Sequence, residues 1–189
     1  MRVIGTVGLP GSGKGEAAAV ADELGVPVVT MGDVVRAECR DRGLDPADHH
    51  GDVARALRAE NGPDAIAERT LPPVEEHLQN HDAVLIDGIR AGVEVERFRE
   101  AFGNDFVLVH VHAPFDVRAE RLLDRGRDTS DGGREALKER DERELGFGMD
   151  AAIESADITV ENVGSLTAFH ERIRRVFADG LDAIREVER

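Results

Sequence analysis

The sequence is poor in several residue types, and each shortage narrows the possible functions. A single cysteine, Cys39, excludes an internal disulfide and any cysteine-based zinc site, and we interpret it as a packing residue. Trp and Tyr are absent, so the two aromatic side chains that combine a large ring with a polar group are missing. The single cysteine makes a reduced, cytoplasmic setting the default expectation. No apolar run is long enough to cross a bilayer, so no membrane partner is expected.

Lysine is also scarce, whereas acidic residues are abundant. Lys14 and Lys138 are the only lysines, and 39 acids against 24 Lys plus Arg give a net charge of −15. A surface for a basic partner is one interpretation and adaptation to multimolar intracellular salt is the other. The acids are spread along the chain, which favours salt adaptation and disfavours nucleic-acid binding. At about 1 M salt the Debye length is about 3 Å, so the overall charge would hardly oppose an anionic ligand.

Valine- and isoleucine-rich runs alternate with helix-like segments along the chain. Strands are expected at residues 2–8, 26–30, 83–87, 106–112 and 157–160, and helices at 14–24, 33–42, roughly 48–79, 116–126 and near the C-terminus. This alternation predicts the α/β class, with a central parallel sheet covered by helices on both faces. We expect a single domain over residues 1–189, with a helical insertion at about 31–80 and a short arginine-rich lid at about 124–145.

The stretch GLPGSGKGEAAA, residues 8–19, follows the first expected strand and precedes a helix. Gly8, Gly13 and Lys14 satisfy the pattern G-x4-G-K, in which glycines turn backbone N–H groups toward an anion. The helix N-terminus adds partial positive charge, and Lys14 can reach the β- and γ-phosphates of a nucleotide. These features predict a three-layer α/β/α P-loop NTPase fold and an ATP site formed by Gly8, Pro10, Gly11, Ser12, Gly13, Lys14, Gly15 and Glu16.

Asp87 ends the expected strand AVLID, where a P-loop enzyme places an acid that holds Mg²⁺ directly or through water. A helix cap is the alternative role for this carboxylate. The segment continues as LIDGIR, in which Gly88 permits close approach and Arg90 can reach a phosphate. We therefore expect Asp87 at a metal site and Arg90 at a phosphate site.

Three segments together resemble the adenylate kinases and related nucleoside monophosphate kinases. GLPGSGKG resembles the family loop G-x-P-G-x-G-K-G, in which a glycine such as Gly15 follows the lysine and Mg²⁺ is held mostly by phosphates and water. VVTMGDVVR resembles T-G-D-x-x-R, and LIDGIR resembles D-G-x-P-R, one residue shorter and without the proline. The resemblance implies an acceptor site, for AMP, formed by Gly32, Asp33, Arg36, Gly88 and Arg90. Glu16 replaces the usual threonine, and its role is open between a first-turn acid and a contact to the water shell of the metal.

Two arginine-rich segments extend the resemblance. In RAERLLDRGR, Arg121 and Arg125 are four residues apart and share a helix face. They resemble a family pair in which one guanidinium covers the donor adenine and the other binds phosphate. LKERDEREL carries Arg140 and Arg143, which the resemblance implies to be lid arginines over the transferred phosphoryl group. Solvated salt bridges with neighbouring acids are the alternative role for each arginine.

Residues 138–164, KERDERELGFGMDAAIESADITVENVG, are similar to an archaeal family of adenylate-kinase-related P-loop proteins. The family pattern R-D-x-R-E-L, then G-x-G, then A-D-x-x-I-x-N is close to this segment. The portion from Ala156 to Gly164 also resembles dephospho-coenzyme A kinases. In both groups the loop after the last strand passes near the donor base, which implies base contacts from Asn162 and Gly164. An ordinary turn is the alternative for these two residues.

The resemblance covers nearly the whole chain and implies a kinase that transfers the γ-phosphate of ATP, with Mg²⁺, to a small nucleotide. Its expected partners are small-molecule nucleotides, and it is expected to be a monomer or a homo-oligomer. A dephospho-coenzyme A kinase-like enzyme and a nucleotide-responsive ATPase or regulatory protein are the alternatives. His49 and His50 are predicted to be surface residues. His110 and His112 share one strand face without an evident third metal ligand, and His112 is expected to shape the site.

Overall fold

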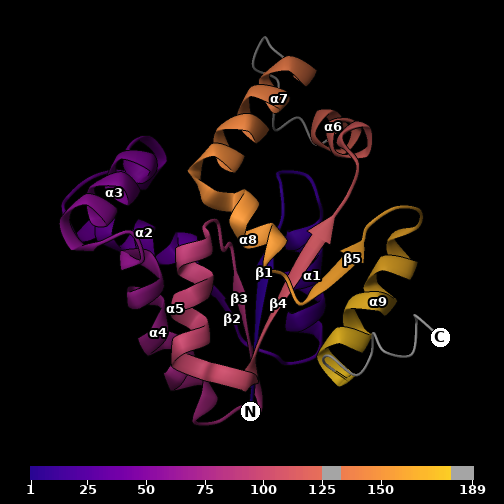
Figure 1. The fold of residues 1–189 in the computed structure, drawn as a ribbon, viewed down its shortest axis with the longest axis horizontal. Coiled ribbons are helices and arrows are strands. Elements are labelled where there is room, and N and C mark those ends of the chain that lie inside the picture. Colours follow the sequence, from indigo (N-terminus) through magenta and orange to yellow (C-terminus); the bar gives the residue numbers. More distant parts are fainter. Residues whose placement is uncertain (125–132, 180–189) are drawn as a thin grey trace.

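A parallel five-stranded sheet forms the centre of the computed structural model, which describes residues 1–124 and 133–179 (Figure 1). Its strands are β1 (Arg2–Val7), β2 (Val28–Thr30), β3 (Ala83–Asp87), β4 (Phe106–His112) and β5 (Ile158–Glu161), in the order β2-β3-β1-β4-β5. All of the strand pairings described are parallel. The expected strands are confirmed, with ends displaced by two residues or fewer.

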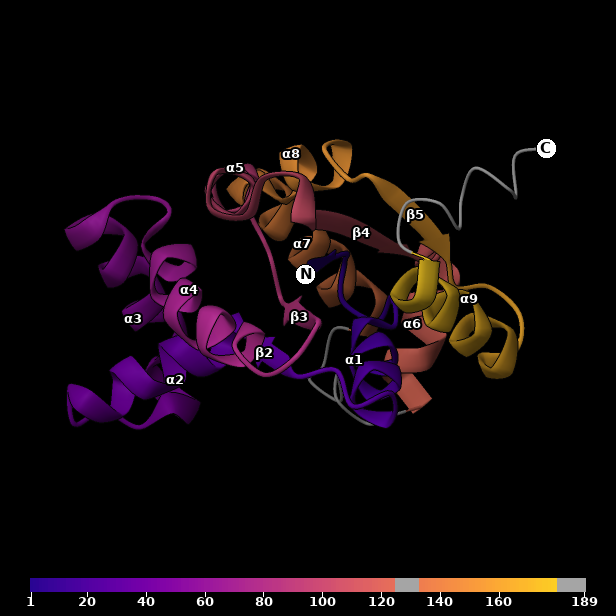
Figure 2. The same ribbon diagram turned by 90° about the horizontal axis from the view of Figure 1, so that it is seen from below.

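Helices cover both faces of the sheet, as Figure 2 shows. On one face lie α1 (Lys14–Glu23) and α9 (Leu166–Asp179), and on the other lie α4 (Ala65–Leu78), α5 (Gly92–Phe102) with the 3-10 turn η1 (Gly103–Asp105), and α8 (Asp150–Glu154). The side chains of β1 alternate between the two layers, so that Val3 is buried on the α5 side and Ile4 on the α1 side. The three-layer α/β/α class is therefore confirmed.

The parallel register brings the C-terminal ends of the strands to one edge of the sheet. Thr6, near the end of β1, lies opposite Asp87 of β3, and Val7 lies opposite His110 of β4. Ligands of open parallel sheets bind at this edge. The phosphate loop after β1 and the acid at the end of β3 are thereby placed side by side.

Three helices lie in the chain between β2 and β3. They are α2 (Met31–Asp41), α3 (Pro46–Asn61) and α4, and α3 lies far from the sheet in both views (Figures 1 and 2). The stretch 48–79, expected to be helical, contains two helices, because Gly62 ends α3 with φ of 104° and Pro63 separates it from α4. Asp45 starts α3, since its side chain accepts a hydrogen bond from the Ala47 amide at 2.9 Å.

The chain after β4 continues over the C-terminal edge of the sheet as α6 (Phe115–Asp124) and α7 (Gly133–Glu144) (Figure 1). A π-helical turn, η2 (Leu145–Met149), leads into α8, and Gly148 interrupts the helix with φ of 98°. Residues 125–132 of the expected lid, with Arg125 among them, lie outside the described residues. Over the ranges that are described, no helix has both the length and the apolar character needed to cross a membrane.

Candidate active site

The phosphate loop, residues 8–13, connects β1 to α1. Gly13 caps the helix with φ of 111°, a left-handed conformation that favours glycine. A Cβ added at Gly13 would lie 2.1 Å from Nδ2 of Asn162, which donates to the carbonyl of Ser12 at 2.8 Å. Asn162 therefore supports the loop from the β5–α9 connection, and only glycine fits beneath it.

Lys14 begins α1, and its ammonium group folds against the loop. Its Nζ donates to the carbonyl of Gly8. Burial lowers the pKa of Lys14 to about 8, while the charges of Asp87 and Glu144 act in the opposite direction. The Ser12 hydroxyl is buried and has no hydrogen-bond partner within residues 1–124 and 133–179. A buried ammonium beside an orphaned hydroxyl and a helix N-terminus fits a bound oxyanion such as a nucleotide phosphate.

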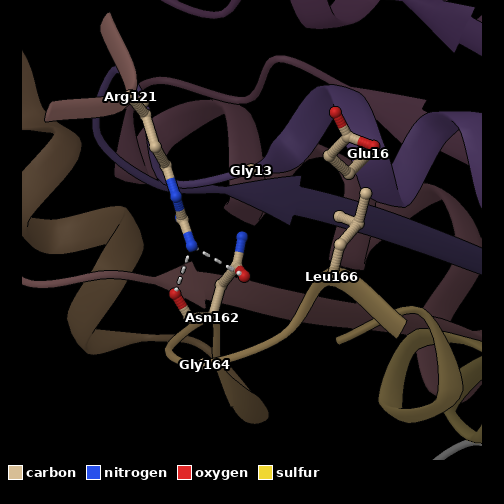
Figure 3. Close-up of a pocket in the computed structure, with 7 residues that line it drawn as sticks. Gly13, Glu16, Arg121, Asn162, Gly164 and Leu166 are labelled. Carbon is tan, nitrogen blue, oxygen red and sulfur yellow. Dashed lines mark hydrogen bonds between the residues drawn. The ribbon is translucent and has the colours of Figure 1, made fainter. Parts of the chain in front are cut away.

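A cavity of about 260 Å³ lies beside the phosphate loop. Figure 3 shows Arg121 on one side, Glu16 and Leu166 on the other, and Asn162 and Gly164 below them. Nη2 of Arg121 donates to the Asn162 carbonyl at 3.0 Å and to its Oδ1 at 3.2 Å. The lining residues are Gly11, Gly13, Glu16, Arg121, Asn162, Gly164 and Leu166. The structure thus gathers the residues predicted for the donor base, together with Leu166, whose apolar side chain gave no signal in the sequence.

Glu16 lies on the first turn of α1, where a carboxylate is stabilised by the helix N-terminus. Its Oε2 is 3.4 Å from Nε2 of His170 on α9. The placement agrees with the first-turn role considered for Glu16. It also puts an acid–histidine pair at the wall of the donor cavity, which the sequence did not predict.

Asp87 lies at the end of β3, and its Oδ1 accepts a hydrogen bond from Oγ1 of Thr6 at 2.8 Å. The alternative role as a helix cap is wrong, because Ala91 precedes α5. Asp87 also exerts the largest favourable charge effect on the Lys14 ammonium. A half-buried carboxylate beside the phosphate loop has the oxygen chemistry that Mg²⁺ prefers.

Glu144, at the end of α7, joins two arginines from different parts of the chain. Its Oε1 lies 3.1 Å from Nε of Arg140 and 3.7 Å from Nη1 of Arg90. The charges of all three residues act on Lys14. Arg90 and Arg140 thus share the carboxylate of Glu144. Glu144 was missed by sequence reasoning, although it lies in the same R-D-x-R-E-L motif as Arg140.

Arg143 does not join this group in the described part of the structure. Its side chain is exposed on α7, and no ion pair or hydrogen bond is found for it among residues 1–124 and 133–179. Arg125, predicted to bind phosphate, lies outside the described residues. Of Arg140 and Arg143, it is the charge of Arg140 that acts on Lys14.

The predicted acceptor residues lie on α2 and on the loop after β3. Arg36 forms an exposed ion pair with Asp33 at 2.7 Å, and its guanidinium lies over Gly32. Gly88 has φ of 96°, which allows the loop to turn toward Arg90. Both arginines thus have a carboxylate neighbour, Asp33 or Glu144.

Two further residues, Glu94 and His50, lie close to the segments that carry these arginines. The sequence analysis did not predict either of them as a site residue. Glu94 is buried on α5, where its Oε2 accepts from the Arg90 amide at 2.9 Å and its Oε1 pairs with Arg58 at 3.0 Å. The prediction of His50 as a surface residue is wrong, because α3 turns it toward α2 and its Nε2 is fully buried. His49 is half-buried. Such contacts between helices leave no local signal in the sequence.

A buried ion pair connects the lid helix to the phosphate loop. Arg118 on α6 is 4% exposed and pairs with both carboxylate oxygens of Asp141 on α7, at 3.0 and 2.6 Å. The same guanidinium donates to the carbonyls of Pro10 and Ala113. Sequence reasoning missed this pair, because a charged residue on an amphipathic helix is ordinarily expected at the surface. Its effect is to fix α7, which carries Arg140 and Glu144, against the phosphate loop.

The histidine pair at the end of β4 has an acidic neighbour. Nδ1 of His112 lies 2.8 Å from Glu161, and the rings of His110 and His112 are 5.5 Å apart. Burial, and then the charge of His112, lowers the pKa of His110. In the described part of the chain, no group of three or more His, Cys, Asp or Glu side chains could hold a metal ion.

Comparison with known proteins identifies the family. A family model described as an AAA domain matches residues 7–138. A UPF0200 protein of the archaeon Halobacterium salinarum is 59% identical over 178 residues, which cover 94% of this chain and 93% of that protein. The chain belongs to the UPF0200 family and contains this AAA domain. The archaeal relatives agree with the resemblance found in residues 138–164.

Solved structures share the fold of this chain. TT1252 from Thermus thermophilus has a TM-score of 0.64 at 20% identity, over 94% of this chain and 97% of that one. A gluconokinase from Sinorhizobium meliloti has a TM-score of 0.57 at 21% identity, over 98% and 94% of the two chains. At this identity the likeness concerns the fold alone. The protein therefore has a P-loop, kinase-like fold.

Proposed function

We propose that the protein is an ATP-dependent phosphotransferase that acts on a small phosphorylated acceptor, with AMP as the first candidate. The observation that carries the proposal is the gathering of Asp87, Arg90 and Arg140 around Lys14 at the C-terminal edge of the sheet. These groups come from the start of α1, the end of β3 with the loop that follows it, and the lid helix. Cations from separate segments that converge on one point suit the transfer of a highly charged group.

The donor side supplies binding and orientation. The loop amides and Lys14 would bind the β- and γ-phosphates, and the cavity beside Gly13 would receive the base and sugar. Arg121 is the side chain proposed to cover the base, because its hydrogen bonds to Asn162 hold the guanidinium at the cavity wall. Gly164 allows the β5–α9 loop to turn there, with φ of 87°.

Asp87 is the residue proposed to hold Mg²⁺, directly or through water. The hydrogen bond from Thr6 fixes one oxygen of its carboxylate. A magnesium ion bound there would neutralise charge on the phosphate oxygens. Lys14 would remain a cation, because the negative charge of the bound phosphates raises the pKa that burial lowers.

The acceptor side is proposed to bind the phosphate of the second substrate through Arg36 and Arg90. Arg140 would lie over the group in transit between the two nucleotides. The protein offers no covalent intermediate in this scheme, and the rate enhancement comes from placing the reacting groups in line and neutralising their charge. Because one fold serves many acceptors, the acceptor must be identified by experiment.

An acceptor screen with the full chain tests the proposal. MgATP and MgGTP are incubated at high potassium chloride with nucleoside monophosphates, dephospho-coenzyme A or gluconate, and phosphorylated products are separated by ion-exchange chromatography. Lys14→Ala is expected to lower product formation by at least about 1,000-fold, because it removes the cation at the transferred phosphate. The matched control is Lys138→Ala, which changes an exposed lysine on α7 and is expected to change the rate by less than about twofold.

Two results would contradict the proposal. Undiminished transfer by Lys14→Ala would show that the phosphate loop is not the donor site. Hydrolysis of ATP by the wild-type protein without any phosphorylated acceptor would instead identify a nucleotide-responsive ATPase. The dephospho-coenzyme A arm distinguishes the alternative acceptor from AMP.

A further inference from the structure

His50 has a buried nitrogen that the folded chain leaves without a partner. The residue lies on α3, in the helical segment between β2 and β3, and its side chain is half-buried. Its Nε2 has no exposure to solvent and no hydrogen-bond partner among residues 1–124 and 133–179. Buried polar atoms are nearly always hydrogen-bonded, so an orphaned one marks a place that a ligand can complete.

The residue next to His50 is Gly32, on the first turn of α2. The backbone of Gly32 acts to raise the pKa of the imidazole, which places the ring near this glycine. The Arg36 guanidinium lies over the same glycine, since an added Cβ there would be 3.1 Å from its Nη1. His50 and the proposed phosphate ligand Arg36 therefore share one neighbour.

Glu94 connects His50 to the second proposed phosphate ligand. Its carboxylate pairs with Arg58, about two helical turns after His50 on α3, and accepts the backbone N–H of Arg90. This bridge holds α3 against the loop after β3. As a result, the charges of Arg36, Arg90 and Arg58 all act on His50.

This environment keeps His50 neutral. Burial lowers its pKa, the backbone of Gly32 opposes that change, and the three guanidinium groups lower the pKa further. A neutral imidazole adds no charge to a phosphate site that already has arginines. It offers one hydrogen bond at Nε2, which suits an uncharged group next to the phosphate.

We propose that Nε2 of His50 hydrogen-bonds the uncharged part of the acceptor, beside the phosphate bound by Arg36 and Arg90. The inference rests on the proposed phosphotransferase function and narrows its substrate class. The acceptor is a phosphate monoester that carries a sugar hydroxyl or ring nitrogen near the phosphate, and a bare inorganic anion does not use His50. A nucleoside monophosphate and a sugar phosphate both have this chemistry.

Binding measurements separate the two parts of the acceptor. The wild-type chain, His50→Phe, His50→Gln and the neighbouring control His49→Gln are saturated with Mg²⁺ and a non-hydrolysable ATP analogue at high potassium chloride. AMP, ribose 5-phosphate and inorganic phosphate are then titrated by calorimetry. His50→Phe is expected to weaken AMP binding by about tenfold, the effect of one lost hydrogen bond, and to weaken inorganic phosphate by less than about twofold. His50→Gln, which keeps a hydrogen-bonding group, is expected to stay within about threefold of wild type.

The ribose 5-phosphate arm identifies the part of the acceptor that His50 contacts. An equal loss for AMP and ribose 5-phosphate places the contact on the sugar, and a loss for AMP alone places it on the base. Equal AMP affinity in His50→Phe and His49→Gln would overturn the inference. An equal loss of affinity for AMP and for inorganic phosphate would also overturn it, because His50 would then have only a structural role. The melting temperature of each variant is measured as a control for folding.

These binding measurements do not depend on whether the protein transfers phosphate. If the wild-type chain binds AMP and His50→Phe weakens that binding, but no phosphate is transferred, the proposed kinase activity is refuted and the proposed AMP contact is supported. A wild-type chain that binds the ATP analogue but neither AMP nor ribose 5-phosphate refutes the acceptor class.

Discussion

The donor and acceptor sides of the site are held together by different kinds of interaction. On the donor side, Asn162 is 3% exposed and Arg118 is 4% exposed, and both bond to backbone carbonyls of the phosphate loop. On the acceptor side, the Arg36 and Arg90 side chains are 40% and 55% exposed and face carboxylates. The donor side is therefore rigid before any ligand binds, whereas acceptor arginines can exchange a carboxylate for a phosphate at small cost.

The buried pair Arg118–Asp141 extends the rigid side into the lid helix. Because α7 is tied to the Pro10 carbonyl through Arg118, Arg140 and Glu144 are placed relative to the loop by buried bonds. Glu144 then provides the counter-charge for Arg90 from the acceptor side. The boundary between the two sides of the site lies at Glu144.

Removing one ion pair on each side is expected to give the largest difference in stability between the donor and acceptor sides. Arg118→Ala leaves the Asp141 carboxylate buried and unpaired, so we expect the free energy of unfolding to fall by about 3–5 kcal/mol. Arg36→Ala removes an exposed pair with Asp33 and is expected to cost less than about 1 kcal/mol. Urea unfolding at constant high potassium chloride measures both. Similar losses of unfolding free energy in the two variants would show that the two sides are held together by interactions of similar strength.

Substitutions at two glycines of the donor side test whether close packing against Asn162 fixes the phosphate loop. Gly13→Ala places a Cβ 2.1 Å from Nδ2 of Asn162 and at φ of 111°, whereas a Cβ at Gly15 would meet nothing within 4 Å. Gly13→Ala is expected to weaken binding of an ATP analogue by at least about tenfold, since strain of this kind costs about 1–3 kcal/mol. Gly15→Ala is the matched control, with an expected change below about threefold. Equal effects in calorimetric titrations would show that the Asn162 contact does not position the loop.

The pH dependence of donor binding tests the buried cation. Burial lowers the pKa of Lys14 to about 8, and a bound polyphosphate favours the charged form, so the pKa in the complex is higher. Affinity for an ATP analogue is therefore expected to be constant below pH 8 and to fall above it, by at most about tenfold per pH unit. Lys14→Arg keeps its charge throughout this range and should remove the dependence. A wild-type affinity that stays constant between pH 8 and 9.5 would contradict the assignment.

The smallest effect is expected at the boundary residue. Glu144→Gln removes the counter-charge of Arg90 and Arg140, so inorganic phosphate is expected to bind about threefold more tightly, the effect of a partly exposed ion pair. Glu142→Gln changes an exposed acid on the same helix and serves as the control for net charge. The contrast should be largest at low salt, where charges are least screened. Weaker phosphate binding in Glu144→Gln would instead show that Glu144 positions the arginines.

The two sides also differ in how well the sequence predicted them. The phosphate loop of the donor side was predicted, because the strand, the glycine loop, Lys14 and the helix are consecutive in the chain and their conformations are local. The residues that reach this loop from other helices, Arg118, Leu166 and His170, were missed. The acceptor arginines were predicted from short motifs, but their partners Glu94, Glu144 and His50 were not. Those partners come from other helices, and their contacts depend on how the helices pack.

The chain by itself determined the parallel α/β fold and the phosphate loop, since strand alternation, glycine and the lysine act through local backbone geometry. Tertiary structure alone decided which charged residues are buried and which arginine meets which acid. Arg118 and Arg143 are both arginines on neighbouring helices, α6 and α7, yet one is buried against Asp141 and the other is exposed. That difference arises because burying a charge requires a partner from another element, and only packing places the two together.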